Sequence, residues 1–493
     1  MSLRIYNSLT KRKEEFAPLQ EGNVGMYVCG VTVYDRCHIG HARAAVVFDV
    51  IFRFLLHLGY KVTYVRNYTD VDDKIIRRAN QEAVSSQEIA ERYIREYEED
   101  MRALEVERPT HEPRATENIP QIIALVEKLV EKGVAYAVDG DVYFSVEKFP
   151  SYGRLSGRDL EEMRAGARVE VDERKNNPLD FALWKSSKPG EPEWESPWGK
   201  GRPGWHIECS AMSQRYLGES FDIHGGGKDL IFPHHENEIA QSEAATGKPF
   251  VRLWVHNGFV NIDHEKMSKS LGNILAIRDL LKEHHPEALR LFLLSNHYRS
   301  PVDFSLQNMA EARVNLDRFY SGLLGIEEFL AGEKEIIPLT PKSMRGVAQE
   351  IFEKVSRVKE KFLEAMEDDF NTALALGHLH DLTRSLNRGL ADKGFRKDRA
   401  APALLGEGRS RLLESGKTLG LFQHPPTEYF QSQQKRYLQT KGLPEEEIQD
   451  LIAKRETARK AKDWARADEI RGQAASLGIV LEDGPTGTTW RPA

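Results

Sequence analysis

Hydrophobic residues recur along the first seventy residues with two different periods. An apolar run over 24–29 ends at Gly30 and predicts a buried strand. From 42 to 58 the apolar residues instead return every three or four positions and stop at Gly59, which predicts a helix. Residues 61–67 return to a strand pattern. A strand, a helix and a strand joined by such short connections predict a right-handed parallel crossover.

The pattern of the chain changes at about residue 114 and again at about residue 204. Between these points a helical pattern over 119–132 is combined with short strand patterns, such as 141–144, and with a loop over 185–203 rich in Pro, Trp and Lys. This mixture predicts an insertion within the first domain. The alternation then resumes as a helix from 206, a strand over 221–224, a glycine turn over 225–227, a helix over 233–246 and a strand over 253–256.

The later part of the chain is expected to be mainly helical. Beyond residue 280, apolar residues keep helical spacing to about residue 420, which is typical of a helical bundle. The Pro-Pro pair within 424–427 indicates a linker. For the small terminal unit that follows, we expect one basic helix over about 445–477 and a hairpin over 479–490.

Length, charge and cysteine count limit the kinds of protein that this chain can be. At 493 residues it is too long for one hydrophobic core, so three or four domains are expected. Its net charge of −7 means that a polyanionic partner would have to meet a local basic patch. No stretch approaches about 18 apolar residues and the N-terminus lacks a signal-peptide core, so no membrane association is expected. Three cysteines in so long a chain indicate a reducing compartment, most simply the cytoplasm. Nothing indicates a dedicated dimer helix, so a monomer is expected.

Two short motifs together predict a divided nucleotide site. The tetrad His-Ile-Gly-His over 38–41 can open a helix whose free N–H groups and positive dipole end favour phosphate. The pentad Lys-Met-Ser-Lys-Ser over 266–270 brings two ammonium groups, those of Lys266 and Lys269, onto a segment with serine and glycine. Such a segment can cover a polyphosphate and neutralise the charge on a leaving pyrophosphate. The pair therefore indicates activation of a carboxylate by ATP.

Four residues that are scattered along the chain could together hold a metal ion. Cys29 ends the first predicted strand, and Cys209 lies on a predicted helix. His234 and Glu238 are four residues apart, so a helix would place them on one face. Two thiolates, an imidazole and a carboxylate suit the tetrahedral preference of Zn²⁺, and sulfur favours zinc over magnesium.

The residues themselves leave alternatives to this zinc site open. Both cysteines could be buried packing residues without a metal. His235 with Glu236 is a rival ligand pair, which we rank lower because the adjacent Glu236 would point away from His235. Cys37 could replace Cys29, but its place beside the histidine motif favours a packing role.

Three further features have more than one interpretation. Gly225 to Gly227 after a strand favour close backbone approach to adenosine, although a tight turn alone would also use them. The carboxylates over 70–73 could hold Mg²⁺, but we favour a helix start. Trp490 beside Arg491 could stack on an RNA base.

With these motifs in place, the chain resembles the class I aminoacyl-tRNA synthetases, and closely resembles the cysteinyl-tRNA synthetases of bacteria. The histidine and lysine motifs indicate the class. The scattered thiols with His-His-Glu-Asn-Glu over 234–238 point to cysteine as the amino acid. The matching segments run nearly from end to end and cover 26–35, 37–41, 66–74, 204–212, 221–227, 232–240, 265–273 and 460–464.

The resemblance implies a role for each matching residue. His38 and His41 would contact the phosphates of Mg²⁺-bound ATP. Gly225 and Asp229 would also bind the ATP. Lys266 and Lys269 would stabilise the leaving pyrophosphate. The remaining residues divide into the zinc ligands Cys29, Cys209, His234 and Glu238 and the substrate pocket Thr69, Trp205, His224 and Asp229. The implied substrates are ATP, L-cysteine and tRNA(Cys).

The fold class expected from pattern and resemblance is α/β. It is a Rossmann-like parallel sheet split by a connective insertion, followed by an α-helical bundle and a small C-terminal α+β domain. The expected domains are 1–113 and 204–250 for the two halves of the catalytic domain, 114–203 for the insertion, 251–310 for a junction carrying the lysine motif, 311–424 for the bundle and 425–493 for an anticodon-binding domain.

A zinc site has a physical reason in a cysteine-activating enzyme. Serine differs from cysteine by one atom, and a pocket that merely fits cannot reject such a near-isostere strongly. A zinc ion that takes the substrate thiolate as a ligand can do so, because sulfur binds it better than a neutral hydroxyl. A separate editing site is then unnecessary. The activated cysteine would pass to a ribose hydroxyl of the terminal tRNA adenosine, for which the class resemblance favours the 2′ position.

Two other functions fit parts of the sequence. A ligase joining activated cysteine to a small amine would use the same adenylating core, but it would not need the bundle and the terminal unit. A zinc-binding module without catalysis would leave Lys266 and Lys269 unexplained.

Overall fold

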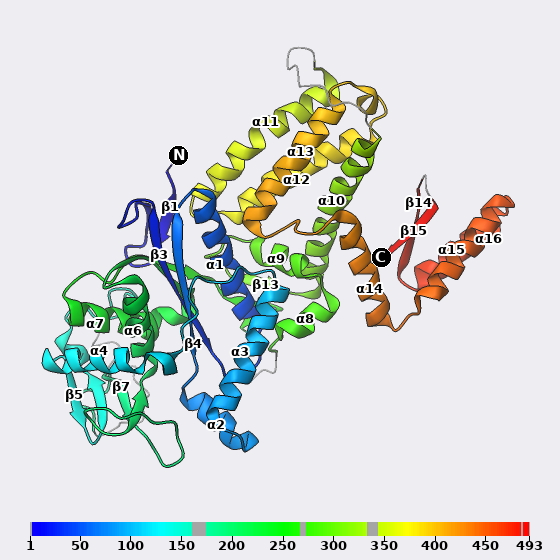
Figure 1. Ribbon diagram of the computed structural model, residues 1–493. Coiled ribbons are helices and arrows are strands. Elements are labelled where there is room, and N and C mark those ends of the chain that lie inside the picture. Colours follow the sequence, from blue (N-terminus) through cyan, green and yellow to red (C-terminus); the bar gives the residue numbers. More distant parts are fainter. Residues whose placement is uncertain (1, 160–173, 267–272, 333–343, 485–486, 493) are drawn as a thin grey trace. The chain divides into compact units, whose positions relative to one another are not determined.

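The computed structural model describes residues 2–159, 174–266, 273–332, 344–484 and 487–492 (Figure 1). These residues fold as two compact units. The first consists of residues 1–277, 292–308 and 359–378, and the second of residues 278–291, 309–358 and 379–493. Within the described ranges, no helix is long and apolar enough to cross a membrane.

A four-stranded parallel sheet forms the centre of the first unit (Figure 1). The helix α1 (Ile39–His57) connects its neighbouring strands β3 and β4, which confirms the predicted crossover. The sheet is completed by strands that follow the insertion in sequence, and β9 pairs with β3. The order is β10 (Val251–Asn257), β9 (Phe221–Gly227), β3 (Asn23–Thr32) and β4 (Lys61–Thr69).

The glycines over 225–227 lie inside strand β9 and do not form the predicted turn. Gly225 pairs with Val28 on one side and Val255 on the other. A Cβ atom at Gly225 would lie 2.2 Å from the ring of Phe48 on α1. The missing side chain therefore allows α1 to pack closely on the sheet.

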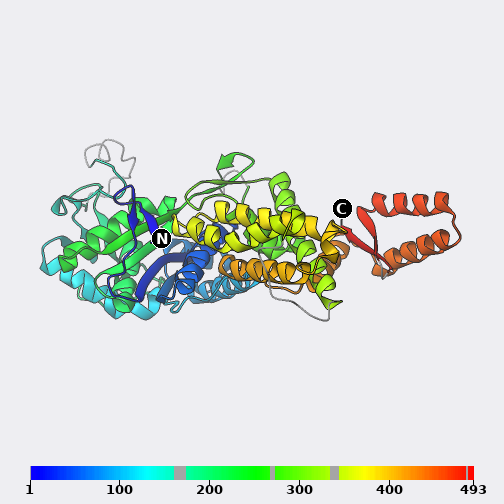
Figure 2. The same cartoon turned by 90° about the horizontal axis from the view of Figure 1, so that it is seen from above.

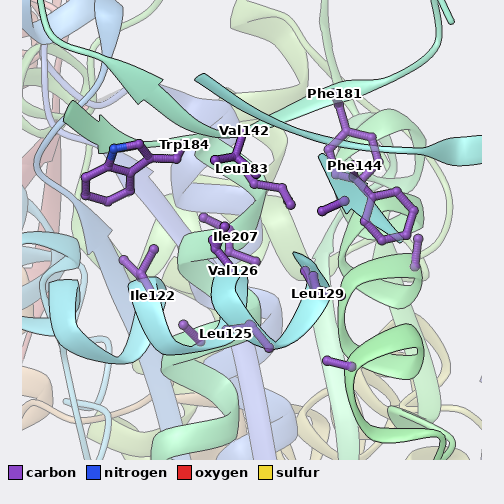
Figure 3. Packing of buried hydrophobic residues seen from close by; sticks show 14 of the residues in the cluster. Ile122, Leu125, Val126, Leu129, Val142, Phe144, Phe181, Leu183, Trp184 and Ile207 are labelled. Carbon is purple, nitrogen blue, oxygen red and sulfur yellow. The ribbon is translucent and has the colours of Figure 1, made fainter. Parts of the chain in front are cut away.

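The predicted insertion contains an antiparallel sheet covered by a helix. The loop expected over 185–203 is partly wrong, because residues at its two ends form strands that pair with each other. The sheet runs β5 (Ala135–Val138), β6 (Asp141–Phe144), β7 (Phe181–Ser186) and β8 (Gly201–Pro203). Figure 3 shows its core, in which Val126 of α4 (Ile119–Glu131) lies beside Ile207 and faces Val142 and Leu183 of the sheet.

The carboxylates over 70–73 begin a helix, as we favoured. Asp72 accepts a hydrogen bond from the backbone N–H of Lys74 (2.8 Å) and caps α2 (Asp73–Glu82). Asp73 pairs with Lys185 (2.8 Å) and with Arg202. The next helix, α3 (Ser86–Ala103), begins with a capping box between Ser85 and Glu88.

Two small sheets complete the first unit. The strands β1 (Arg4–Asn7) and β2 (Arg12–Glu15) form an antiparallel hairpin. The strand β11 (Val260–Ile262) lies between β12 (Glu265–Lys266), with which it is antiparallel, and β13 (Val302–Phe304), with which it is parallel. The sequence pattern did not predict β13.

The predicted helical texture beyond residue 280 is confirmed, and Figure 1 shows the long helices side by side. Their apolar faces are buried against one another, as expected for a bundle. The helices are α8 (Ile277–Glu283), α9 (Pro286–Leu294), α10 (Leu306–Ala331), α11 (Gly346–Glu367), α12 (Thr372–Ala391) and α13 (Ala401–Leu419).

The predicted linker over 424–427 is wrong, because the helix α14 (Pro426–Lys441) begins within it. Proline suits the first turn of a helix, where its missing N–H is not needed. The chain before α14 is held by the buried carboxylate of Glu287, which accepts hydrogen bonds from the backbone N–H groups of Phe422 and Gln423 (both 2.8 Å).

We expect His285 to make the second unit sensitive to acid. Its buried ring contacts those of His424 and Tyr429, and burial lowers the pKa of His285 to about 3. Since an unfolded histidine has a pKa of about 6.5, the unfolded chain binds an extra proton between these values. Stability should be complete above about pH 6.5 and fall by up to about 1.4 kcal/mol per pH unit below it.

Hydrogen exchange of α9 and α10 between about pH 5 and about pH 7 measures this loss, after correction for intrinsic exchange rates. The variant His285→Asn keeps an acceptor for the backbone N–H of Glu287, which now donates to His285 Nδ1 (3.2 Å). It should lose less protection in acid than the parent chain. Equal losses in both chains would contradict the assignment.

The terminal unit contains two helices and not the single predicted helix. The helices α15 (Glu445–Lys460) and α16 (Trp464–Ser476) lie side by side (Figure 2). The chain reverses at Lys462, which has a φ of 57°, and Asp463 caps α16. The predicted hairpin is confirmed as β14 (Ile479–Gly484) and β15 (Gly487–Pro492).

The two tryptophans of the terminal unit differ in exposure. Trp490 is only 5% exposed and packs with Ile448 and Leu481 in the core of this unit, so the prediction that it stacks on RNA is wrong. Trp464 at the start of α16 is 60% exposed.

Candidate active site

The histidine motif forms the start of α1, directly after strand β3. His38 is the N-cap residue, and its Nδ1 accepts from the backbone N–H of Gly40 (3.1 Å). The Nδ1 atom of His41 accepts in turn from the backbone N–H of His38 (3.1 Å). The two rings are stacked with centroids 3.8 Å apart. Because both Nδ1 atoms act as acceptors, each neutral ring carries its proton on Nε2.

This capping changes how the helix start can bind phosphate. The N–H groups of Ile39 and Gly40 were expected to be free, but Ile39 donates to the Leu275 carbonyl (3.0 Å) and Gly40 to His38. The expectation of free N–H groups is therefore wrong at these two positions. The imidazole Nε2–H groups are the side-chain donors that the motif itself offers.

The backbone joins the histidine motif to the segment that follows the lysine motif in sequence. His38 and Ala276 form an antiparallel bridge, and Ile277 donates to the carbonyl of Cys37 (3.0 Å). The chain that follows the lysine motif is thus hydrogen-bonded to the histidine motif. Lys266 ends β12 and pairs with Asn261 of β11. Lys269 lies outside the described residues.

The helix that carries His41 is fixed by a buried arginine. Arg43 donates to the carbonyls of His297 (3.1 Å) and Tyr298 (3.2 Å), which come shortly before β13. Burial lowers the pKa of Arg43 to about 10. Since β13 pairs with β11, this contact connects the histidine helix to the sheet from which the lysine motif extends.

The four predicted metal ligands lie together in the first unit. The two sulfur atoms of Cys29 and Cys209 are 3.6 Å apart, and Cys29 Sγ is 3.4 Å from Glu238 Oε1. His234 Nε2 is 3.1 Å from the same carboxylate oxygen. All four donor atoms lie within 4.8 Å of one another. They come from β3, α6 (Trp205–Leu217), the turn before α7 and α7 itself (Glu236–Thr246).

Three of the six donor–donor separations are close to the edges of a tetrahedral zinc site. Typical zinc bond lengths give edges of roughly 3.8 Å between two sulfurs, 3.6 Å between sulfur and oxygen and 3.4 Å between nitrogen and oxygen. Each measured separation is within a few tenths of an ångström of its edge. Burial raises the pKa of both the Cys29 and the Cys209 thiols, so a bound cation would have to displace their protons.

A second group of donors overlaps the first and consists of Cys29, His224, His235 and Glu238. It has one thiol fewer, and His235 Nε2 is 3.9 Å from Glu238 Oε1, against 3.1 Å for His234. His224 instead bonds the other carboxylate oxygen (2.9 Å), as a residue that orients a ligand does. The geometry therefore favours the predicted set.

The rival carboxylate Glu236 is used elsewhere. It accepts from the backbone N–H of Ser156 (2.8 Å) and belongs to neither donor group. Cys37 is buried and is absent from both donor groups, in agreement with a packing role.

The predicted pocket residues are brought to the cluster to different degrees. The Trp205 ring is stacked on that of His234, with centroids 4.2 Å apart, and is 37% exposed. Thr69 at the end of β4 is buried and donates to Glu208 (2.9 Å). Asp229 lies on the exposed turn after β9, and no described contact joins it to the cluster.

Sequence reasoning missed the polar residues that support these side chains. Burial raises the pKa of Glu208 well above its usual value, and this buried carboxyl accepts from the Thr69 hydroxyl. His206 pairs with Nδ1 of His234 (2.9 Å), and His256 pairs with Nδ1 of His235 (2.8 Å). Glu208 and His206 adjoin Cys209 in sequence, and that position was the only available signal.

Three family profiles match the chain. They are "tRNA synthetases class I (C) catalytic domain" over residues 15–314, "DALR domain" over 361–423 and "Cysteinyl-tRNA ligase anticodon binding domain" over 440–491. The match to the terminal unit argues against the small-molecule ligase and the binding module, since neither needs such a domain.

Similar proteins agree with these profiles. Cysteine–tRNA ligases from Syntrophotalea carbinolica and Geobacter metallireducens are 58% and 59% identical, over 100% of this chain and 100% of theirs. A solved structure, Mycobacterium tuberculosis methionyl-tRNA synthetase in complex with methionyl-adenylate, shares the fold, with a TM-score of 0.61 and 17% identity over 80% of this chain and 91% of that one. The profile match over most of the chain and the full-length identity place this protein in the cysteinyl-tRNA synthetase family of the class I aminoacyl-tRNA synthetases.

Proposed function

We propose that this cysteine–tRNA ligase selects L-cysteine with a zinc ion held by Cys29, Cys209, His234 and Glu238. The observation that carries the proposal is the match between the separations of these donors and the edges of a zinc tetrahedron. When bound, the ion supplies a ligand position that prefers the substrate thiolate to the hydroxyl of serine.

The residues around the cluster then hold the amino acid. Trp205 and His224 contact the ligands His234 and Glu238, so they line the place where the substrate side chain would enter. Thr69 donates its hydroxyl proton to Glu208 (2.9 Å), so its oxygen can accept from the substrate amino group. Thr69 and His224 are buried, and the exclusion of water on their side strengthens their contacts with the substrate.

Adenylate formation needs positioning and charge stabilisation and no side-chain nucleophile. The cysteine carboxylate attacks the α-phosphate of Mg²⁺-bound ATP, and pyrophosphate leaves. The Nε2–H groups of His38 and His41 donate to the phosphates, while Lys266 and Lys269 neutralise the leaving pyrophosphate. Gly225 and Asp229 receive the adenosine. A ribose hydroxyl of the 3′-terminal adenosine of tRNA(Cys) then attacks the cysteinyl carbonyl of the adenylate, and AMP leaves.

Two assays in sequence test the proposed function. Cysteine should stimulate the exchange of pyrophosphate into ATP, serine should not, and tRNA(Cys) should then be charged. Exchange that serine supports as well as cysteine would contradict the role of zinc. Exchange without charging of tRNA would contradict the second step.

We also propose that the chain works as a monomer in the cytoplasm. Its three cysteines are free thiols, and two of them are the proposed metal ligands, which an oxidising compartment would threaten. Light scattering of the purified protein tests the monomer.

We expect Trp464 to contribute to tRNA binding. Its exposed indole comes shortly after the basic residues Arg459, Lys460 and Lys462 in the sequence of the terminal unit. Stacking of one base on an aromatic ring is worth about 1–3 kcal/mol, so Trp464→Ala should raise the KM for tRNA about 10-fold. Cysteine-dependent exchange should not change. The variant Trp464→Phe retains a ring and should keep most of the binding, and equal losses in both variants would contradict stacking.

A further inference from the structure

A small basic pocket opens beside the histidine motif in the first unit. Its volume is about 270 Å³. One wall is the loop after β3, and the other is the outer face of helix α2. It is lined by Tyr34, Asp35, Lys74, Arg77, Arg78 and Gln81.

The pocket lies at the edge of the sheet where the proposed chemistry occurs. β3 and β4 are parallel neighbours, so their carboxyl ends meet at one edge. In the sequence, Tyr34 comes four residues before His38, and Lys74 comes five residues after Thr69. A strand of nucleic acid whose end reaches His38 and Thr69 must therefore pass close to this pocket.

The pocket carries an excess of positive charge. Within the described ranges, Lys74 and Arg77 form no ion pair, and both are exposed. Arg78 pairs with Glu82, and Asp35 is the one carboxylate of the lining. The ammonium of Lys74 lies over the Tyr34 ring, 5.4 Å from its centroid, which holds the amine at the mouth.

Neither cation is needed to hold the fold. The Asp72 carboxylate caps the start of α2 by accepting a hydrogen bond from the backbone N–H of Lys74. The side chain of Lys74 takes no part in this cap. In a chain of net charge −7, unpaired cations on one face are a local site for a polyanion. A pocket of this size admits a phosphate group and its ester oxygens, which a guanidinium fork and an ammonium recognise together.

We propose that this pocket binds a backbone phosphate in the single-stranded 3′ end of the tRNA acceptor arm. The contact positions the terminal adenosine at the sheet edge and carries no sequence information, since a phosphodiester is the same at every nucleotide. The inference rests on the proposed function, because it assumes that the tRNA end must reach His38 and Thr69.

The test compares Lys74→Gln, Arg77→Gln and the double variant with the parent enzyme. The double variant should raise the KM for tRNA about 10-fold and leave cysteine-dependent pyrophosphate exchange unchanged. Each lost phosphate contact should reduce the slope of log kcat/KM against log salt by about 0.7. The matched control is Arg102→Gln, which removes one exposed charge from the neighbouring helix α3 outside the pocket. It should alter neither quantity.

An RNA minihelix that contains only the acceptor arm locates the contact. The double variant should lose as much activity on the minihelix as on the whole tRNA, and Lys74→Arg with Arg77→Lys should restore it. A loss seen only with whole tRNA, or an unchanged KM and salt slope, would overturn the proposal. A parallel fall in pyrophosphate exchange would assign the pocket to ATP and would also overturn it. Failure of the proposed function is distinct, since the parent enzyme would then show no cysteine-dependent exchange.

Discussion

Cys209→Ser should lose its zinc and its cysteine-dependent pyrophosphate exchange together, the latter by at least about 100-fold. Substitution of residues that merely orient zinc ligands costs about 10- to 100-fold, and Cys209 is itself a proposed ligand. Its thiol is 3.6 Å from that of Cys29 and 1% exposed, so serine would leave a neutral hydroxyl in place of one of two sulfur donors. Metal content per chain and the exchange rate are the two measurements.

The third cysteine provides a matched control for this substitution. Cys37 is also buried, but it lies outside both donor groups. Cys37→Ser should retain one zinc ion per chain, so the same chemical change is tested without loss of a ligand. If Cys209→Ser kept full exchange after losing its zinc, the ion would have no part in selecting the substrate.

His41→Asn should lower pyrophosphate exchange by about 100- to 1,000-fold, the usual cost of removing one donor to a charge that develops in the transition state. The asparagine oxygen can still accept from the backbone N–H of His38, so the capping box can persist. What the variant loses is the Nε2–H group beyond that bond. The loss should appear mainly in kcat, because the donor acts most strongly on the charge that forms during the reaction.

The same helix offers the control for this prediction. His57 lies in the last turn of α1 and is exposed, so His57→Asn makes the same change at the opposite end. It should leave both exchange and zinc content unaltered. A fall in the zinc content of His41→Asn would show that the helix start supports the metal site, and would contradict a role confined to phosphate.

The parts of the fold that sequence predicts are those specified by local patterns. The helix after β3 shows its period in its own residues, and Asp72 has the residue type of a cap. The glycine strand could not be predicted in this way, because the ring of Phe48 that requires Gly225 comes from a helix far away in sequence. Trp490 was misjudged for the same reason, since its partners Ile448 and Leu481 are brought to it by the fold.

The residues of the candidate site likewise divide into those that local sequence predicts and those that only the fold brings together. Residue chemistry pointed to Cys29 and Cys209, because thiols are few in this chain. The residues ranked His234 above His235 and the resemblance implied it, and the distances to Glu238 agree while differing by less than 1 Å. The supporting pairs of His206 and His256 and the bridge between His38 and Ala276 join segments that no local pattern connects.

The spacing of the metal ligands gives the proposed zinc ion a mechanical role besides its chemical one. Cys29 and Cys209 are separated by 180 residues, and the predicted insertion lies between them. A link that closes a loop of this length removes chain entropy from the unfolded state worth about 5 kcal/mol, by the relation used for disulfides. The ion would therefore act as a reversible cross-link between β3 and α6, which the insertion separates in sequence. The affinity of zinc for sulfur, which distinguishes cysteine from serine, would then also set the strength of that cross-link.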